Sequence, residues 1–187
     1  MQPDLQLTVR EETANDAAAV DQVVQEAFGQ RDEAEIVVRL RNRNELTLSL
    51  VAEVTAAGQQ NSLMAGHIAF SPVTIAGQSG GQRWLGLAPV SVAPEFQRQG
   101  IGSQLIEAGL ERCRGLGAEL VVVLGEPGYY SRFGFEPASR FGLENCFGVD
   151  EPFRVLVLNG RPEDVPHGMV AYSPAVMGTD VDGTVSG

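Results

Sequence analysis

The segment between residues 90 and 124 constrains the fold of this chain more than any other. A short apolar run, Val90–Val92, leads into a turn with two glycines, Gly100 and Gly102, and then into a helical pattern. The helix is followed by Leu120–Leu124, where every residue is apolar. A strand that is apolar at every position suits burial on both faces, as in a parallel pair. Strand, helix and strand in this order predict one right-handed crossover within a sheet.

The residues before this crossover predict two helices and then an antiparallel group of strands. Residues 7–10 suit a first strand. Asn15 can cap the helix that follows, and Gly29 is a natural end for it. Asp32 together with Glu35 fits the cap of a second, shorter helix. Apolar and polar residues then alternate with the period of a strand at 48–54, 63–70 and 84–92.

The net charge of the chain limits the classes of partner that we expect it to bind. The chain has 13 Lys+Arg and 24 Asp+Glu, a net charge of −11 with both histidines neutral. This excess argues against nucleic acid or an anionic membrane as the main partner, because phosphates need a basic face. It is compatible with a cationic small molecule or peptide, and it is also common in plain soluble proteins. No stretch is long and apolar enough to span a bilayer.

The cysteines and histidines predict no disulfide framework and no metal site. Cys113 and Cys146 lie far apart, and neither His67 nor His167 has a cysteine or histidine at ligand spacing. Residues 1–5 lack the basic and apolar regions of a secretory signal. We therefore expect a cytoplasmic protein in a reducing compartment.

The two glycines before the helix predict an anion site. Gly100 and Gly102 remove side chains where amide N–H groups at a helix start stay unpaired, an arrangement that binds phosphate. Taken alone, the same glycines fit a tight turn equally well. The string is not a P-loop, and it is not a Rossmann fingerprint, because Leu105 stands where the third glycine would be.

The string Gln97-x-x-Gly100-x-Gly102, preceded by Val90–Val92 and Pro94, resembles the acetyl-CoA-binding motif of the GNAT family. These are the Gcn5-related N-acetyltransferases, whose motif is written [QR]-x-x-G-x-[GA]. Residues 130–135 match the family's Y-x-[KR]-x-G-F signature, and one helix and one strand separate the two motifs, as in the family. Residues 124–135 and 66–73 are also similar to a bacterial subgroup of predicted acetyltransferases.

The resemblance covers roughly residues 7–137 and implies the GNAT fold. This is an α+β fold with α/β/α layers, in which helices flank a mixed, mostly antiparallel sheet of about six or seven strands. The strands around Val90 and Val122 would be parallel and splay apart. We expect a single domain at 1–175, with a core at 7–137 and an extension at 138–175, then a flexible tail at 176–187.

The resemblance also implies acetyl-CoA as cosubstrate, with no metal. The preceding strand would hold the pantetheine arm, and the amides of the turn would hold the pyrophosphate. Many family members contact the cofactor with an asparagine after the strand that follows the central helix, and here Gly125–Gly128 stands there instead. The implied cofactor-binding residues are Val90, Ser91, Val92, Gln97, Arg98, Gln99, Gly100, Ile101, Gly102, Ser103, Pro127, Tyr130 and Arg132.

The reaction implied is attack of a primary amine, on a small molecule or peptide, on the thioester carbonyl. Tyr130 would act as general acid to the thiolate, and the alternative for it is plain aromatic packing. Glu53 and His67 are candidate bases, and each also fits an ordinary strand residue. A non-catalytic acyl-CoA-binding or sensing domain, and transfer of a larger acyl group, are the competing functions. Many family members dimerise, so a homodimer is a further expectation.

Overall fold

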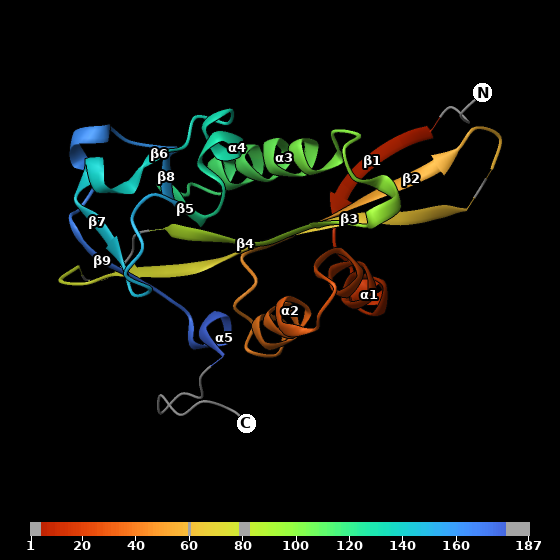
Figure 1. The fold of residues 1–187 in the computed structure, drawn as a ribbon, viewed down its shortest axis with the longest axis horizontal. Coiled ribbons are helices and arrows are strands. Elements are labelled where there is room, and N and C mark those ends of the chain that lie inside the picture. Colours follow the sequence, from red (N-terminus) through yellow and green to blue (C-terminus); the bar gives the residue numbers. More distant parts are fainter. Residues whose placement is uncertain (1–4, 60, 79–82, 179–187) are drawn as a thin grey trace. The chain divides into compact units, whose positions relative to one another are not determined.

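The computed structural model describes residues 5–59, 61–78 and 83–178 (Figure 1). Its nine strands follow the hydrogen-bonded order β1-β2-β3-β4-β5-β8-β6, with β9 paired to β3 and to β7. This path of seven strands agrees with the predicted mixed sheet, and β7 and β9 add two more. The strands are β1 (Leu5–Glu11), β2 (Leu48–Ala56), β3 (Ser62–Ile75), β4 (Trp84–Val92), β5 (Leu120–Leu124), β6 (Glu136–Pro137), β7 (Leu143–Asn145), β8 (Phe153–Val157) and β9 (Gly168–Tyr172).

The chain forms two compact units. Unit 1 comprises Met1–Ala69 and Pro89–Gly109, and unit 2 comprises Phe70–Ala88 and Leu110–Gly187. Strands β3 and β4 and helix α3 pass from one unit into the other. The α-helices are α1 (Ala17–Phe28), α2 (Asp32–Asn42), α3 (Ile101–Gly115), α4 (Pro127–Ser131) and α5 (Pro174–Met177). The 3-10 helices are η1 (Ala14–Asp16), η2 (Pro94–Phe96), η3 (Ala138–Phe141) and η4 (Pro162–Asp164).

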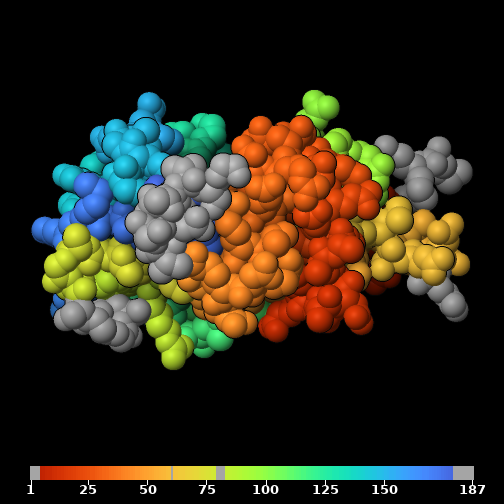
Figure 2. Space-filling view, turned by 90° about the horizontal axis from the view of Figure 1, so that it is seen from below, coloured from red at the N-terminus to blue at the C-terminus, as the bar shows by residue number. Residues whose placement is uncertain are grey.

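Unit 1 is a three-layer sandwich. β1 pairs antiparallel with β2, from Leu5 opposite Ala56 to Glu11 opposite Leu50. Helices α1 and α2 lie side by side on one face, where the space-filling view shows them from red to orange (Figure 2). The start of α3 lies on the other face (Figure 1). The inward residues of α1 and α2 are apolar and nearly inaccessible: Val20, Val23, Val24, Ala34, Val37 and Leu40.

The ends of these helices were predicted only in part. Gly29 ends α1 in the left-handed conformation, at φ 71°, as expected. The Asn15 cap is wrong, because Asn15 lies inside η1, whose N-cap is Thr13. Asp32 is the first residue of α2 and not its cap, and its carboxylate lies in the first turn, where the helix dipole favours negative charge. Both helices therefore exist where predicted, with different caps.

Unit 2 contains the predicted parallel pair. Trp84, Leu85 and Gly86 of β4 pair with Leu120, Val121 and Val122 of β5, and the register ends there. Residues Leu120 to Val123 are at most 1% exposed, which explains why the run is apolar throughout. β5 also pairs antiparallel with β8. Helix α3 joins the two parallel strands, as the crossover requires.

The segment after residue 138 was predicted least well. β7 pairs parallel with β9, and β9 pairs antiparallel with β3, which extends to Ile75, beyond the predicted end at 70. Helix α5 occupies Pro174–Met177, so the first positions of the predicted tail are helical. The remainder of that tail, 179–187, and most of the predicted loop at 77–81 lie outside the described residues. Whether 1–175 is one domain stays a prediction.

Candidate functional site

The loop between β4 and α3 has the backbone of an anion site. Two residues in it have positive φ, Arg98 at 60° and Gly100 at 85°. Arg98 is not a glycine, so its conformation is strained, and strained residues cluster at functional sites. The side-chain amide of Gln97 donates to the carbonyl oxygen of Val92 at 3.0 Å, and that of Gln99 donates to Glu95 O at 3.1 Å. The first bond ties the loop to the end of β4, and the second ties it to η2.

The amides at the start of α3 remain available to a ligand. The amide of Gln104 donates to Gly100 O at 3.1 Å, so the amides of Ile101, Gly102 and Ser103 precede the first bond of the helix. Positions 97–100 are exposed, and a Cβ on Gly100 would meet no atom within 4 Å. Helix α3 has fifteen residues, and the open space at its start fits a pyrophosphate held by amides and the helix dipole.

β3 packs closely against the end of β4. A Cβ on Gly66 would lie 2.7 Å from the carbonyl oxygen of Ser91, so only glycine fits that position. The amide of Ala93 donates to Ala65 O at 2.9 Å, and the Ser91 hydroxyl donates to His67 O at 3.4 Å. The strand predicted to hold the pantetheine arm therefore has a fixed neighbour in β3.

His67 is completely buried and belongs to a polar cluster. Its Nε2 lies 2.8 Å from the hydroxyl of Ser49, and that hydroxyl donates to the carboxylate of Glu12. Because the Ser49 hydroxyl donates its one hydrogen to Glu12, its oxygen accepts a hydrogen bond from the Nε2–H of His67. Arg41 also donates to Glu12, at 2.6 Å. Nδ1 of His67 has no hydrogen-bond partner among the described residues.

Burial and hydrogen bonding set the protonation states of His67 and Glu12. Burial lowers the pKa of His67 more than the neighbouring Glu12 raises it, so the imidazole is neutral at neutral pH. The pKa of Glu12 falls to about 2, because hydrogen bonds from His67, Ser49 and Arg41 outweigh its burial. A neutral imidazole with a bare Nδ1 can accept a proton, which is the property required of a base.

Glu53, the other candidate base, is held in an ion pair. Both of its oxygens accept from Arg10, at 2.7 and 3.1 Å, and Arg10 also donates to Asp16 at 2.7 and 2.9 Å. These hydrogen bonds raise the pKa of Arg10 and hold the pKa of Asp16 well below its usual range. The side chain of Glu53 is 22% exposed, so its carboxylate still reaches solvent.

Tyr130 lies on α4, and its ring packs against other aromatic rings. Its ring meets Tyr129 edge to face, with centroids 5.2 Å apart, and Phe135 with centroids 5.6 Å apart. The residue is 6% exposed. Burial, and to a smaller degree Tyr129, raise the pKa of Tyr130 to about 12, so the phenol keeps its proton at neutral pH. A protonated phenol held rigidly can act as a general acid.

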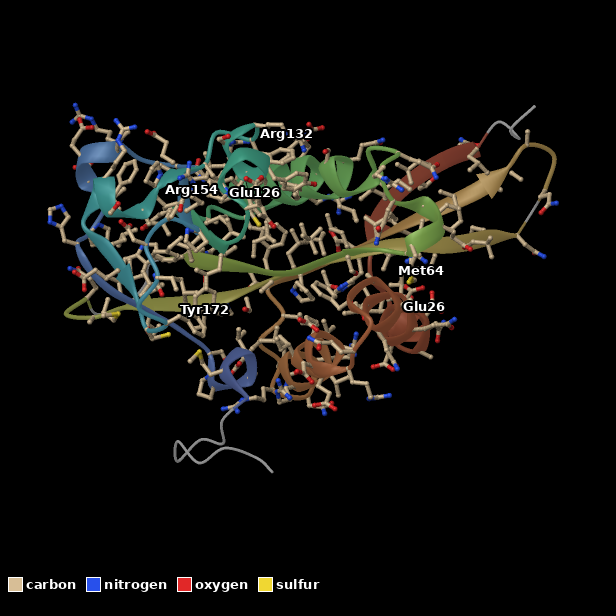
Figure 3. All side chains as sticks on the ribbon, in the orientation of Figure 1. Glu26, Met64, Glu126, Arg132, Arg154 and Tyr172 are labelled. Carbon is tan, nitrogen blue, oxygen red and sulfur yellow. The ribbon has the colours of Figure 1, made fainter. Side chains whose placement is uncertain are left out.

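Glu126 holds the start of α4. Its carboxylate accepts from the amide of Gly128 at 2.8 Å and from the amide of Tyr129, while Pro127 takes the first helical position. Glu126 thus caps this short helix at the place where the family's asparagine is missing. The guanidinium of Arg132 lies 4.6 Å from the centroid of the Tyr129 ring, a cation–π contact that fixes it beside α4. Figure 3 labels Glu126 and Arg132.

The predicted site residues divide between the two units. Unit 1 holds the residues of the β4 end and the turn, together with Glu53 and His67. Unit 2 holds Tyr130, Pro127 and Arg132. The partners of His67, namely Glu12, Ser49 and Arg41, were not predicted, because no local pattern signals a contact between distant segments. The cap by Glu126 was not predicted either, although a glutamate before proline at a helix start is a recognisable signal.

The part of the chain that the structure describes holds neither a metal-binding cluster nor a membrane-spanning helix. No three histidine, cysteine, aspartate or glutamate side chains there gather into a group that could hold a metal ion. No helix within the same residues is both long and apolar enough to cross a membrane.

The mixed sheet with its parallel pair and the amide-rich start of α3 agree with the fold and the turn that the GNAT resemblance implies. Residues 8–138 match the sequence profile of the acetyltransferase (GNAT) domain. The chain therefore belongs to the GNAT family of N-acetyltransferases. It is 34% identical over 167 residues to the uncharacterized N-acetyltransferase YhbS of Escherichia coli K12, covering 89% of this chain and 96% of that protein.

Solved structures show the same fold. The crystal structure of YhbS from Escherichia coli in complex with CoA has a TM-score of 0.81 and 34% identity, with 94% of each chain covered. A GNAT family acetyltransferase from Brucella melitensis in complex with acetyl-CoA has a TM-score of 0.73 and 40% identity, covering 91% of this chain and 97% of that chain. The first of these similar structures holds CoA and the second holds acetyl-CoA, the cosubstrate that the motif resemblance implies for this chain.

Proposed function

We propose that this protein transfers the acetyl group of acetyl-CoA to a primary amine of a small molecule or peptide. The observation that carries the proposal is the loop of residues 97–103 at the start of a long helix. In this loop the amides of Ile101, Gly102 and Ser103 precede the first bond of the helix, the space over Gly100 is open, and Arg98 is strained. It is supported by the CoA and acetyl-CoA complexes of the two similar structures. The pyrophosphate would bind these amides, and Arg98 would lie near the phosphates.

In the proposed reaction, the amine nitrogen forms a bond to the thioester carbonyl carbon, and the carbon–sulfur bond breaks. A backbone N–H around Val92 holds the carbonyl oxygen as charge develops on it. Tyr130 gives its proton to the departing thiolate, for which its buried and protonated phenol is suited. The amine proton leaves to a base, for which Glu53 and His67 are the two proposed groups.

The proposal is tested by measuring turnover of acetyl-CoA against a panel of amines, with the wild-type protein and Tyr130→Phe. We expect acetylation of at least one amine and a loss of tenfold or more in turnover for Tyr130→Phe. Affinity for CoA should fall by no more than about tenfold, the effect of one lost hydrogen bond to the sulfur. Tyr129→Phe is the matched control, since its hydroxyl has no proposed role. Tight binding of CoA with no turnover of any amine would instead identify a binding or sensing domain.

The same assay, repeated with other acyl-CoA thioesters, tests which acyl group the protein transfers. We propose acetyl transfer, so acetyl-CoA should give a higher kcat/KM than propionyl-CoA or succinyl-CoA. A preference for either larger acyl group would replace the acetyl assignment while leaving the amine and the roles of the residues in place.

A further inference from the structure

The hydrogen bonds around His67 determine which of its two ring nitrogens carries the proton. The carboxylate of Glu12 is paired with Arg41 and ionised, so it accepts hydrogen bonds and donates none. The Ser49 hydroxyl donates its one hydrogen to this carboxylate. The hydrogen between Ser49 and His67, whose atoms are 2.8 Å apart, therefore comes from Nε2. In the neutral imidazole the other nitrogen, Nδ1, then keeps its lone pair.

Nδ1 of His67 is a buried acceptor without a hydrogen-bond partner among the described residues. The whole side chain is inaccessible to solvent. A buried acceptor that is left unpaired costs free energy, and such a group is explained when a bound molecule supplies the missing donor. The N–H of an amine is a donor of this kind.

Strand β3 places His67 beside the end of β4, within the same unit. The amide of Ala93 donates to Ala65 O at 2.9 Å. The Ser91 hydroxyl donates to His67 O at 3.4 Å. Neighbouring strands lie about 4.8 Å apart, so the backbone of His67 is one strand spacing from the part of β4 where the proposed function places the thioester carbonyl. A base at this distance can act directly or through one water molecule.

Glu53, the other proposed base, has both oxygens engaged. They accept from Arg10 at 2.7 and 3.1 Å. Protonation of either oxygen would weaken a charge-assisted hydrogen bond to the guanidinium. Nδ1 of His67 can take a proton without losing any bond within the described residues, which favours His67 over Glu53.

We propose that Ser49 and Glu12 position His67 as the base of the proposed acetyl transfer. Nδ1 takes a proton from the attacking amine nitrogen as that nitrogen bonds to the carbonyl carbon. The imidazolium then donates its Nε2–H to Ser49, which donates to Glu12, and the negative charge of Glu12 stabilises the new positive charge. After the product leaves, His67 returns its proton to water and Tyr130 regains one. This inference rests on the proposed function.

Two charged groups act on the imidazole. Glu12, after β1, favours the imidazolium, and Arg41, on α2, disfavours it. β2 and β4 contribute the hydroxyls of Ser49 and Ser91, which carry no charge. Loss of the link to Glu12 should therefore lower the pKa of His67, and the acid limb of the activity profile should move to lower pH.

The first experiment compares pH profiles of kcat/KM for the wild type, Ser49→Ala and Ser49→Thr. Ser49→Ala should move the acid limb down by about 0.5–1 pH unit, the effect of one hydrogen bond, and lower kcat/KM about tenfold. Ser49→Thr keeps the hydroxyl and should restore both. Glu12→Gln should move the limb further, because it removes the charge itself. Ser62→Ala, an exposed serine on β3, is the matched control and should change neither.

The second experiment reads the protonation of His67 directly by ¹⁵N NMR. The chain has two histidines, and the exposed His167 serves as the internal reference. The wild type at neutral pH should show the proton on Nε2 and a bare Nδ1. CoA together with an amine that the wild type acetylates forms no product, because the acetyl group is absent. This mixture should shift the Nδ1 signal of His67, and Ser49→Ala should give both tautomers.

The inference is overturned if the wild type carries the proton on Nδ1, or if CoA and the amine leave the Nδ1 signal where it was. An unmoved acid limb in Ser49→Ala, with activity lowered equally at every pH, would show a merely structural role and would also overturn it. Failure of the proposed function is a different result, in which the wild type acetylates no amine. The assignment of a base would then fall with it, whichever tautomer His67 shows.

Discussion

The ring of Tyr130 lies directly against the backbone of Gly125, so that a Cβ at position 125 would collide with ring atoms Cε2 and Cδ2. Neither residue can easily move away. The amide of Gly125 donates to Pro152 O at 2.9 Å, and the amide of Tyr130 donates to Glu126 O at 3.2 Å. The position of the proposed general acid therefore depends on the absence of a side chain at the end of β5.

Gly125→Ala should displace the ring of Tyr130 and lower kcat about tenfold or more, since misplacing a catalytic group by about 1 Å can cost 10²-fold. Affinity for CoA should fall much less than kcat, because the loop of residues 97–103, which is proposed to bind the pyrophosphate, is untouched. Stability should fall by about 1–3 kcal/mol from overpacking. The measurement is kcat and CoA affinity of the folded variant.

The matched control is Gly115→Ala, at the end of α3, where a Cβ would meet no atom within 4 Å. It should leave kcat unchanged and be neutral or slightly stabilising. An unaltered kcat in Gly125→Ala would mean that the placement of Tyr130 does not matter for turnover.

Gly100→Glu should abolish CoA binding by placing a side chain and a negative charge in the phosphate cradle. The positive φ of 85° adds backbone strain, because side chains other than glycine rarely adopt it. Gly58→Glu is a control for strain and charge together, since Gly58 has φ 80° and equally open surroundings. Titration with CoA checks both variants, and unchanged affinity in a folded Gly100→Glu protein would show that the phosphates bind elsewhere.

The two proposed bases are distinguished by pH profiles of kcat/KM for Glu53→Gln and His67→Asn. Replacing the true base by a group that does not titrate should lower kcat/KM about 10²-fold or more and flatten the acid limb of the profile. The other variant should keep the limb and lose only stability, through the ion pair with Arg10 or the bond to Ser49. If both variants keep the acid limb, neither residue is the base.

Stability should decline in acid in two stages. The pKa of His67 is lower in the folded protein than its ordinary value of 6.5, so the unfolded chain binds the extra proton and stability falls as the pH drops below 6.5. The pKa of Glu12 is lowered from 4.5 to about 2, so its contribution is complete above pH 4.5 and is lost between pH 4.5 and 2. Urea unfolding at a series of pH values measures both stages.

Two variants assign these stages. His67→Gln should remove the decline that begins near pH 6.5. Glu12→Gln should lower the free energy of unfolding by about 3 kcal/mol at pH 7, because it leaves Arg41 without its buried partner, and by much less at pH 2. Equal losses for Glu12→Gln at pH 7 and pH 2 would contradict the assignment of the second stage.

The amino-acid sequence determined the parts of this protein that depend on short segments. An apolar run such as Leu120–Leu124 must be buried on both faces, and the face of α3 carrying Leu105 and Leu110 must be covered, so the crossover could be predicted. Two glycines before a helix leave amides free whatever surrounds them. These local requirements were enough for the crossover and for the phosphate-binding turn.

Only the tertiary structure decided what depends on segments far apart in the chain. No periodicity in residues 138–187 indicates that β9 pairs with β3, and that pairing alone brings the ring of Tyr172 onto Gly86. Likewise, His67 could be placed on a strand, but its neutral imidazole follows from complete burial beside Glu12. The burial and the charge of a side chain depend on residues that are distant in the sequence and come into contact with it only in the folded protein. Burial and charge in turn decide whether the side chain is reactive.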